Sequence, residues 1–180
     1  MTFMLASTCN SSFDEKVLND PKFTSGREYE TNKLIQPKVF HFENYTLVEG
    51  NCSTSSTLGL FYENKEIYLS KHSDGMFDTL MQANLNNDGI PDFLVEYAFE
   101  DGATLLALLS KSKTIFIEKE LSNEISSYYC GDIGDTSNYI IPLTISDINH
   151  DGKDEVIINL VKMNDTVFGI ACTDTIYADK

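Results

Sequence analysis

The architecture of this chain can be inferred from residues 147–158, whose sequence is DINHDGKDEVII. Oxygen-bearing side chains stand at positions 1, 3, 5 and 9 of this stretch, glycine stands at position 6, and a β-branched run follows. Ca²⁺ takes about six to eight oxygen ligands, and alternate residues of a tight loop can direct their oxygens inward together. Glycine makes the sharp turn at position 6 at the least conformational cost. The stretch therefore predicts a calcium-binding loop that leads into a β-strand.

The same pattern occurs earlier, in residues 84–95, whose sequence is NLNNDGIPDFLV. We call residues 84–92 the first loop and residues 147–155 the second loop. The second loop offers three carboxylates at the ligand positions and the first offers only Asp88 and Asp92. Because ligand charge tunes calcium affinity, we expect two Ca²⁺ sites, of which the second loop is the tighter. Val95 and Ile158 stand where an EF-hand has its bidentate Glu, which excludes a calmodulin-like switch.

Short strands separated by turns follow both loops. Turn residues at 63–65 predict a hairpin before the first loop. Turn residues at 100–102, 111–113 and 164–165 predict hairpins after the loops, so each loop is followed by a strand, a hairpin and a strand. The two copies, residues 84–121 and 142–180, fit a four-stranded meander such as a propeller blade. We expect an all-β fold of antiparallel meander sheets that resembles a partial β-propeller, because the chain is too short to close one.

Two segments are expected along the chain. Residues 37–180 are predicted to form a single all-β domain, whose first strand covers residues 39–48. Residues 1–36 are rich in polar residues and lack a sustained apolar period, which predicts a flexible, disordered N-terminal tether with one short helical turn near residues 13–18. The start of this tether resembles the end of a bacterial lipoprotein signal, with small residues before Cys9 and a polar stretch after it. We expect either lipid attachment at Cys9 or a chance match.

The charge and the cysteines indicate the compartment. The formal net charge of −15 disfavours nucleic acid and anionic membranes as partners and favours cations or a basic protein. Cys9, Cys52, Cys130 and Cys172 form no C-x-x-C pair, which argues against a zinc site and leaves either disulfides with undetermined pairing or free thiols. Calcium reaches millimolar concentrations outside the cytosol, so the two calcium loops favour an exported protein. No run of 18 apolar residues exists, so no transmembrane segment is expected.

No catalytic motif is present. The three histidines have no metal-ligand spacing, and the chain lacks a G-x-S-x-G elbow, a phosphate-binding glycine loop and an H-E-x-x-H motif. We therefore expect a protein that is not an enzyme. Tyr128 and Tyr129, beside Cys130 in a polar connection, are the candidate partner-binding residues.

The two loops resemble the calcium loops of FG-GAP and VCBS-type repeats, which occur in integrin α-subunit propellers and bacterial surface proteins. In the second loop the resemblance implies the side chains of Asp147, Asn149, Asp151 and Glu155 and the carbonyl of Lys153 as ligands. In the first loop it implies the side chains of Asn84, Asn86, Asp88 and Asp92 and the carbonyl of Ile90.

These observations lead to one main hypothesis and two alternatives. The main hypothesis is a non-catalytic, calcium-stabilised binding protein that recognises a protein or a glycan. It would work outside the cytoplasm, as a periplasmic, secreted or outer-membrane lipid-anchored protein. The first alternative is a periplasmic lysozyme inhibitor or immunity-type protein, because an acidic inhibitor suits a basic lysozyme. The second is an enzyme of unrecognised class, with a pair of carboxylates that only the fold brings together.

Overall fold

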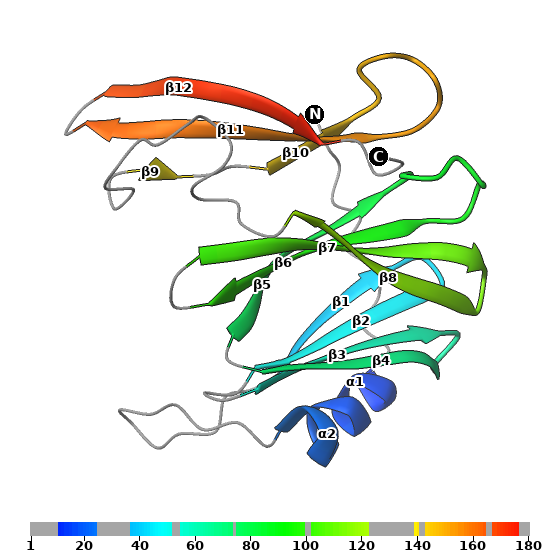
Figure 1. Ribbon diagram of the computed structural model, residues 1–180. Helices are drawn as coiled ribbons and strands as arrows, with labels where there is room; N and C mark the ends of the chain where they lie inside the picture. Colours follow the sequence, from blue (N-terminus) through cyan, green and yellow to red (C-terminus); the bar gives the residue numbers. More distant parts are fainter. Residues whose placement is uncertain are drawn as a thin grey trace. The chain divides into compact units, whose positions relative to one another are not determined.

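The computed structural model describes residues 11–24, 37–51, 55–73, 75–99, 102–122, 139–140, 143–164 and 167–176. The chain divides into two compact units. The first unit comprises Met1–Asp78, Ala98–Glu100 and Lys113–Phe116, and the second comprises Thr79–Tyr97, Asp101–Ser112 and Ile117–Lys180. Most of the described residues lie in antiparallel β-sheets, which confirms the predicted all-β class (Figure 1).

The first sheet is a meander of four strands in the order β1-β2-β3-β4. Its strands are β1 (Lys38–Phe42), β2 (Tyr45–Asn51), β3 (Ser55–Tyr62) and β4 (Lys65–Ser73). The predicted strand over residues 39–48 is in fact a hairpin, because Glu43 adopts a left-handed φ of 50° and reverses the chain. The hairpin predicted around residues 63–65 is confirmed, with Glu63 and Asn64 both at positive φ.

The second and third sheets each contain one of the loops. The second sheet has the order β5-β6-β7-β8, from β5 (Gly75–Ala83), β6 (Asp92–Phe99), β7 (Gly102–Ser112) and β8 (Ile115–Ser122). The third has the order β10-β11-β12, with β9 also paired to β11. Its strands are β9 (Tyr139–Ile140), β10 (Leu143–Ser146), β11 (Glu155–Asn164) and β12 (Val167–Ile176). The first loop connects β5 to β6 and the second connects β10 to β11, as the repeat predicts.

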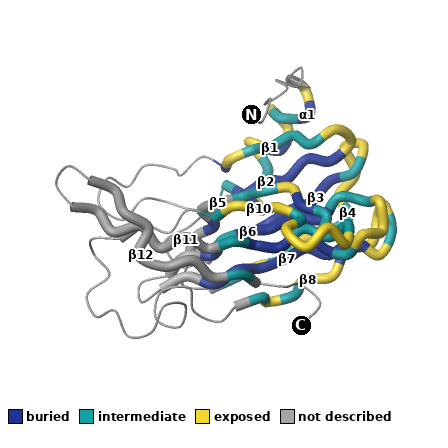
Figure 2. Tube along the Cα trace, turned by 90° about the horizontal axis from the view of Figure 1, so that it is seen from above, coloured by how far each residue is buried: buried dark blue, intermediate teal, exposed yellow. Residues whose placement is uncertain are grey.

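One apolar cluster of the second unit joins these two sheets. Leu94 of β6, Leu105 of β7 and Val156 of β11 are buried in the same cluster as Leu85 of the first loop. β6 and β7 are buried along nearly their whole described length, whereas the turn after β7 is exposed (Figure 2). Burying one such side chain fully stabilises the fold by about 1.5–3 kcal/mol. Both loops therefore lead into strands whose first residues are fixed in a common core.

Two short helices occupy part of the segment predicted to be a flexible tether. α1 (Ser11–Leu18) and α2 (Pro21–Thr24) lie against the sheet of β1–β4 (Figure 1). Phe13, Val17 and Phe23 are buried against Val48 and Phe61. The prediction of a disordered tether is therefore corrected for residues 11–24, because three apolar side chains fold this segment onto the sheet.

The placement of α2 follows from its cap and from two glycines. Asp20 accepts the Lys22 N–H at 2.9 Å as an N-cap, and Pro21 takes the first helical position, where its missing N–H costs nothing. A Cβ added to Gly50 would lie 2.6 Å from the Phe23 backbone, and one added to Gly59 would lie 2.6 Å from the Phe23 ring. These glycines of β2 and β3 thus leave the hollow that Phe23 fills.

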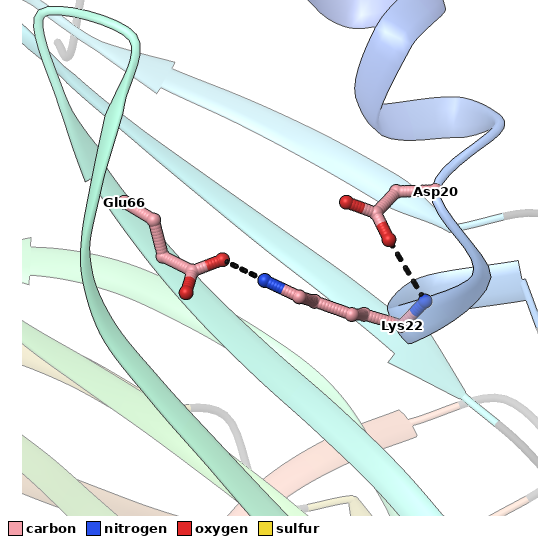
Figure 3. Close-up of polar contacts among 3 residues, drawn as sticks. All are labelled: Asp20, Lys22 and Glu66. Carbon is pink, nitrogen blue, oxygen red and sulfur yellow. Dashed lines mark hydrogen bonds and ion pairs between the residues drawn. The ribbon is translucent and has the colours of Figure 1, made fainter.

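Polar contacts at the edges of the helices contribute less to stability than this apolar burial does. Lys22 donates to Glu66 of β4 at 2.7 Å, an exposed pair shown in Figure 3 that raises the pKa of the Lys22 amine. His41 Nε2 lies 3.1 Å from Asp14 Oδ2 of α1, and His41 Nδ1 lies 3.2 Å from the hydroxyl of Thr46. Apolar burial is therefore the main force that holds the two helices.

Candidate metal-binding loops

The two loops have the same backbone conformation. Position 4 is left-handed in both, with φ of 57° at Asn87 and 62° at His150. Position 6 is also left-handed, with φ of 77° at Gly89 and 88° at Gly152. Glycine adopts this region without steric cost, and asparagine visits it more readily than most other residues. The spacing of turn residues in the sequence thus predicted two equivalent bends.

In the second loop the polar side chains cap backbone N–H groups of the same bend. The two carboxylate oxygens of Asp147 accept from Asp151 N–H at 3.1 Å and from Gly152 N–H at 3.0 Å. Asn149 Oδ1 also accepts from Asp151 N–H, at 2.9 Å, and Asp151 Oδ1 accepts from Lys153 N–H at 2.9 Å. Positions 1, 3 and 5 are therefore folded over the bend, as residues of a tight Asx turn are.

The carboxylate at position 9 closes the second loop from the first residue of β11. Glu155 is only 2% exposed. Its Oε2 accepts the Ile148 N–H at 2.9 Å, and its Oε1 accepts the Asn149 Nδ2 at 2.8 Å. A buried carboxylate needs such donors, because an unpaired charge away from water is costly. The position-3 amide therefore lies between the bend and the acid at position 9.

The first loop is closed in the same way, with one additional residue. Asp92 is fully buried, and its Oδ2 accepts the Leu85 N–H at 2.7 Å. The Ser110 hydroxyl, from β7, lies 2.8 Å from Asp88 Oδ2 and 2.9 Å from Asp92 Oδ1. The Asn86 amide nitrogen lies 3.2 Å and 3.3 Å from the same two oxygens. Two donors of the protein thus occupy the position between the two acids.

Burial dominates the protonation of Asp92. Removal from water raises the pKa of its carboxyl above the ordinary value of 3.8, and the nearby Asp88 acts in the same direction. Hydrogen bonds from Ser110 and Leu85 lower the pKa but do not cancel the effect of burial. Ser110 was not anticipated from the sequence, because it stands 18 residues from Asp92 and carries no loop motif.

The two loops contact each other directly. Asn84 donates from Nδ2 to the Gly152 carbonyl at 2.6 Å, and its backbone carbonyl accepts the Asp154 N–H at 2.7 Å. The Asp154 carboxylate accepts the Asn84 N–H at 2.7 Å, and Asn87 Nδ2 donates to the Asp151 carbonyl at 3.3 Å. The sequence predicted two separate sites, whereas the structure brings both bends into one hydrogen-bonded assembly.

The donor set of the second loop fits a hard cation. It combines three carboxylates, one amide oxygen and one backbone carbonyl, the ligand types that Ca²⁺ takes. In the described part of the chain, no three His, Cys, Asp or Glu side chains are gathered in a metal-holding group. The carboxylates are instead engaged with N–H groups of the bend. A bound cation would require the Asn149 amide nitrogen to leave Glu155, so that acidic oxygens can face the ion.

The donor set of the first loop fits a cation less well. Asn84 directs its amide nitrogen to Gly152, and Ser110 and Asn86 already bridge Asp88 and Asp92. Ile90 is half-buried, and its N–H donates to Asp88 Oδ1 at 2.8 Å. The expectation that the second loop is the tighter of the two stays a prediction.

The other predicted site residues cannot be placed. Cys9, Cys52, Tyr128, Tyr129 and Cys130 lie outside the described residues, and only the backbone of Cys172, in β12, is described. Lipidation, disulfide pairing and the tyrosine contact surface therefore stay predictions.

Comparison with known proteins gives no family for this chain. No family model, no curated protein and no solved structure matches it. The FG-GAP and VCBS resemblance stays a prediction that depends on the two loops. No helix among the described residues is long and apolar enough to cross a membrane.

Proposed function

We propose that this chain is a non-catalytic binding protein whose second loop binds Ca²⁺ and thereby stabilises the start of β11. The observation that carries this proposal is that Asp147, Asn149, Asp151 and Glu155 all accept backbone N–H groups of one glycine-hinged bend. Its twin at residues 84–92 has the same left-handed residues at positions 4 and 6. A repeated bend with oxygen donors at every ligand position is better explained by a cation than by turn formation alone, for which glycine and a single Asx residue suffice.

The chain's own groups supply the coordination. Asp147, Asn149, Asp151 and Glu155 would hold the ion through side-chain oxygens and Lys153 through its carbonyl. When bound, the ion supplies positive charge that offsets the repulsion among three carboxylates. The N–H groups that now cap Asp147 and Asp151 keep these side chains over the bend. The first loop, with Asn84, Asn86, Asp88, Ile90 and Asp92, would be a weaker second site.

The proposed setting is outside the cytoplasm. A calcium site of moderate affinity is useful where calcium is near 1 mM. The proposed partner is a protein or glycan of the cell surface or periplasm, with Tyr128 and Tyr129 as contact residues. Lipid attachment at Cys9 would anchor the chain there.

Calorimetric titration with CaCl₂ tests the metal site. The parent chain should bind Ca²⁺ with a Kd of about 0.1–1 mM, the range of extracellular calcium modules. Asp151→Ala should abolish the tighter binding event, and Asp88→Ala should leave it intact. Glu15→Ala is the matched control, because it removes one exposed negative charge of α1, far from both loops in the sequence. Absence of calcium binding in the parent, or loss of binding in the Glu15 variant, contradicts the proposal.

The net charge favours a second candidate function, inhibition of a basic enzyme such as lysozyme. A chain with 28 acidic and 13 basic residues attracts a cationic protein electrostatically. A lysozyme turbidity assay separates this function from surface adhesion. Inhibition that weakens as salt is raised from 50 to 300 mM supports the inhibitor, and undiminished lysis at excess protein contradicts it.

A further inference from the structure

Asn84 is hydrogen-bonded to the second loop on both sides of Lys153. Its side-chain nitrogen donates to the carbonyl of Gly152 at 2.6 Å. Its backbone carbonyl accepts the N–H of Asp154 at 2.7 Å, and its own N–H donates to the Asp154 carboxylate at 2.7 Å. One residue of the first loop thus holds the peptide group before Lys153 and the peptide group after it.

These hydrogen bonds determine where the Lys153 carbonyl points. The Asp154 N–H and the Lys153 C=O belong to one planar peptide group, and no described peptide bond is cis. In a trans peptide the N–H and C=O point in opposite directions. Because the Asp154 N–H points to the backbone carbonyl of Asn84, the Lys153 carbonyl must point away from Asn84. The Asn84 side chain holds the preceding peptide group, through the Gly152 carbonyl, in the same contact. A hydrogen bond accepted from the N–H also polarises the group and strengthens its oxygen as an electron donor.

We propose that Asn84 is a positioning residue for the cation site of the second loop, because it orients the Lys153 carbonyl that serves there as a ligand. This inference depends on the proposed calcium function of the second loop. The first loop then acts chiefly as a support for the second rather than as an equal site. Groups that orient metal ligands in this way typically change metal affinity about 10–100-fold when they are removed.

The amide at position 84 has a chemical reason in this arrangement. A carboxylate there cannot donate to the Gly152 carbonyl and would bring a negative charge against an oxygen. Asn84 Oδ1 meanwhile accepts the Asn87 N–H at 3.1 Å, so both ends of the amide are used. The residue that seemed from the sequence to be a weakened ligand thus supplies a donor that an aspartate at this position could not supply.

The test measures calcium affinity in the Asp88→Ala background, so that the second loop dominates the titration. Asn84→Asp and Asn84→Ala should each weaken binding at least tenfold. An added negative charge alone would tighten calcium binding, so weakening by the aspartate variant separates positioning from electrostatics. Asn64→Asp, in the β3–β4 turn, is the control with the same change in charge, and it should leave the affinity unchanged. Unchanged or tighter binding in Asn84→Asp overturns the proposal.

A second measurement does not need calcium. Amide hydrogen exchange at Asp154 in the calcium-free full chain should accelerate at least tenfold in both Asn84 variants, and stay as in the parent in Asn64→Asp. If the parent binds no calcium, the proposed function fails, while the exchange rate at Asp154 still decides whether Asn84 holds this peptide group. Both variants keep the backbone carbonyl that accepts the Asp154 N–H, so accelerated exchange reports the loss of the side-chain bond to Gly152. Unchanged exchange in both Asn84 variants overturns the positioning role of the Asn84 side chain.

Discussion

Gly152 is the residue at which the two bends approach most closely. A Cβ added there would lie 2.6 Å from the Asn87 amide nitrogen, and its φ of +88° disfavours any side chain. Gly89, the equivalent residue of the first loop, has a φ of +77° but no atom within 4 Å of an added Cβ. Both glycines avoid backbone strain, but only Gly152 also contacts the other loop. Comparison of the two positions therefore separates the effect of strain from the effect of the contact.

Replacement of these two glycines by alanine should therefore have unequal effects. Gly89→Ala should lower the free energy of unfolding by about 1 kcal/mol, the cost of a left-handed side chain. Gly152→Ala should lower it by about 2–3 kcal/mol, because Asn87 must also move and lose its bond to Asp151. Urea unfolding measures both values. Equal losses would mean that the contact between the loops contributes nothing.

Asp92 should give stability a dependence on pH. Since burial raises the pKa of its carboxyl, the folded chain holds this proton more tightly than the unfolded chain does. The contribution of Asp92 to stability is therefore fully present below about pH 3.8 and is lost as the pH rises through the raised folded value. Asp92→Asn removes this dependence, although it also replaces an acceptor and lowers stability overall.

Urea unfolding of the parent and of Asp92→Asn in calcium-free buffer, at intervals from pH 3.5 to 7, tests this sign. The stability of the parent should fall relative to that of the variant as the pH rises, with no further change once Asp92 is ionised in both states. A constant difference between the two curves contradicts the assigned effect of burial.

At the scale of elements, Phe23 is the most deeply buried of the three apolar side chains that hold the helices on the first sheet. Phe23 is 1% exposed and fills the hollow above Gly50 and Gly59. Phe23→Ala should lower the free energy of unfolding by about 3–5 kcal/mol, the usual cost of emptying such a site. Glu66→Gln, which removes only the exposed pair with Lys22, should leave the thermal midpoint nearly unchanged. A larger loss from Glu66→Gln than from Phe23→Ala would refute apolar anchoring.

These elements show where inference from the sequence succeeds and where it stops. β3, β4, β6 and β7 were predictable, because short runs rich in apolar residues lie between turn signals. α1 was predicted only as a short helical turn near residues 13–18 and α2 was missed, because eight and four residues are too few to show a helical period. These helices are held in place by packing on glycines of β2 and β3. Local sequence patterns do not contain such long-range contacts.

At the scale of the whole molecule, the repeat predicted two bends but not their association. The bonds between Asn84 and the second loop join residues 68 and 70 positions apart. They depend on a donor at position 84 and on Asp154, an acid at loop position 8 that no ligand pattern uses. Local spacing determines the shape of each bend, whereas the pairing of two bends depends on how the β5–β8 and β10–β12 sheets share a core.

Calcium and Phe23 should stabilise the chain independently, because the loops and the Phe23 anchor belong to different compact units and share no described residue. At 1 mM calcium and a Kd of about 0.1 mM, one occupied site adds about 1.4 kcal/mol and raises Tm by about 3–6 °C. EGTA should reverse this rise, and Asp151→Ala should prevent it. Since distant sites add within about 0.5 kcal/mol, Phe23→Ala should cost the same with calcium and with EGTA. A coupling above about 1 kcal/mol in this cycle would mean that the two units respond to calcium together.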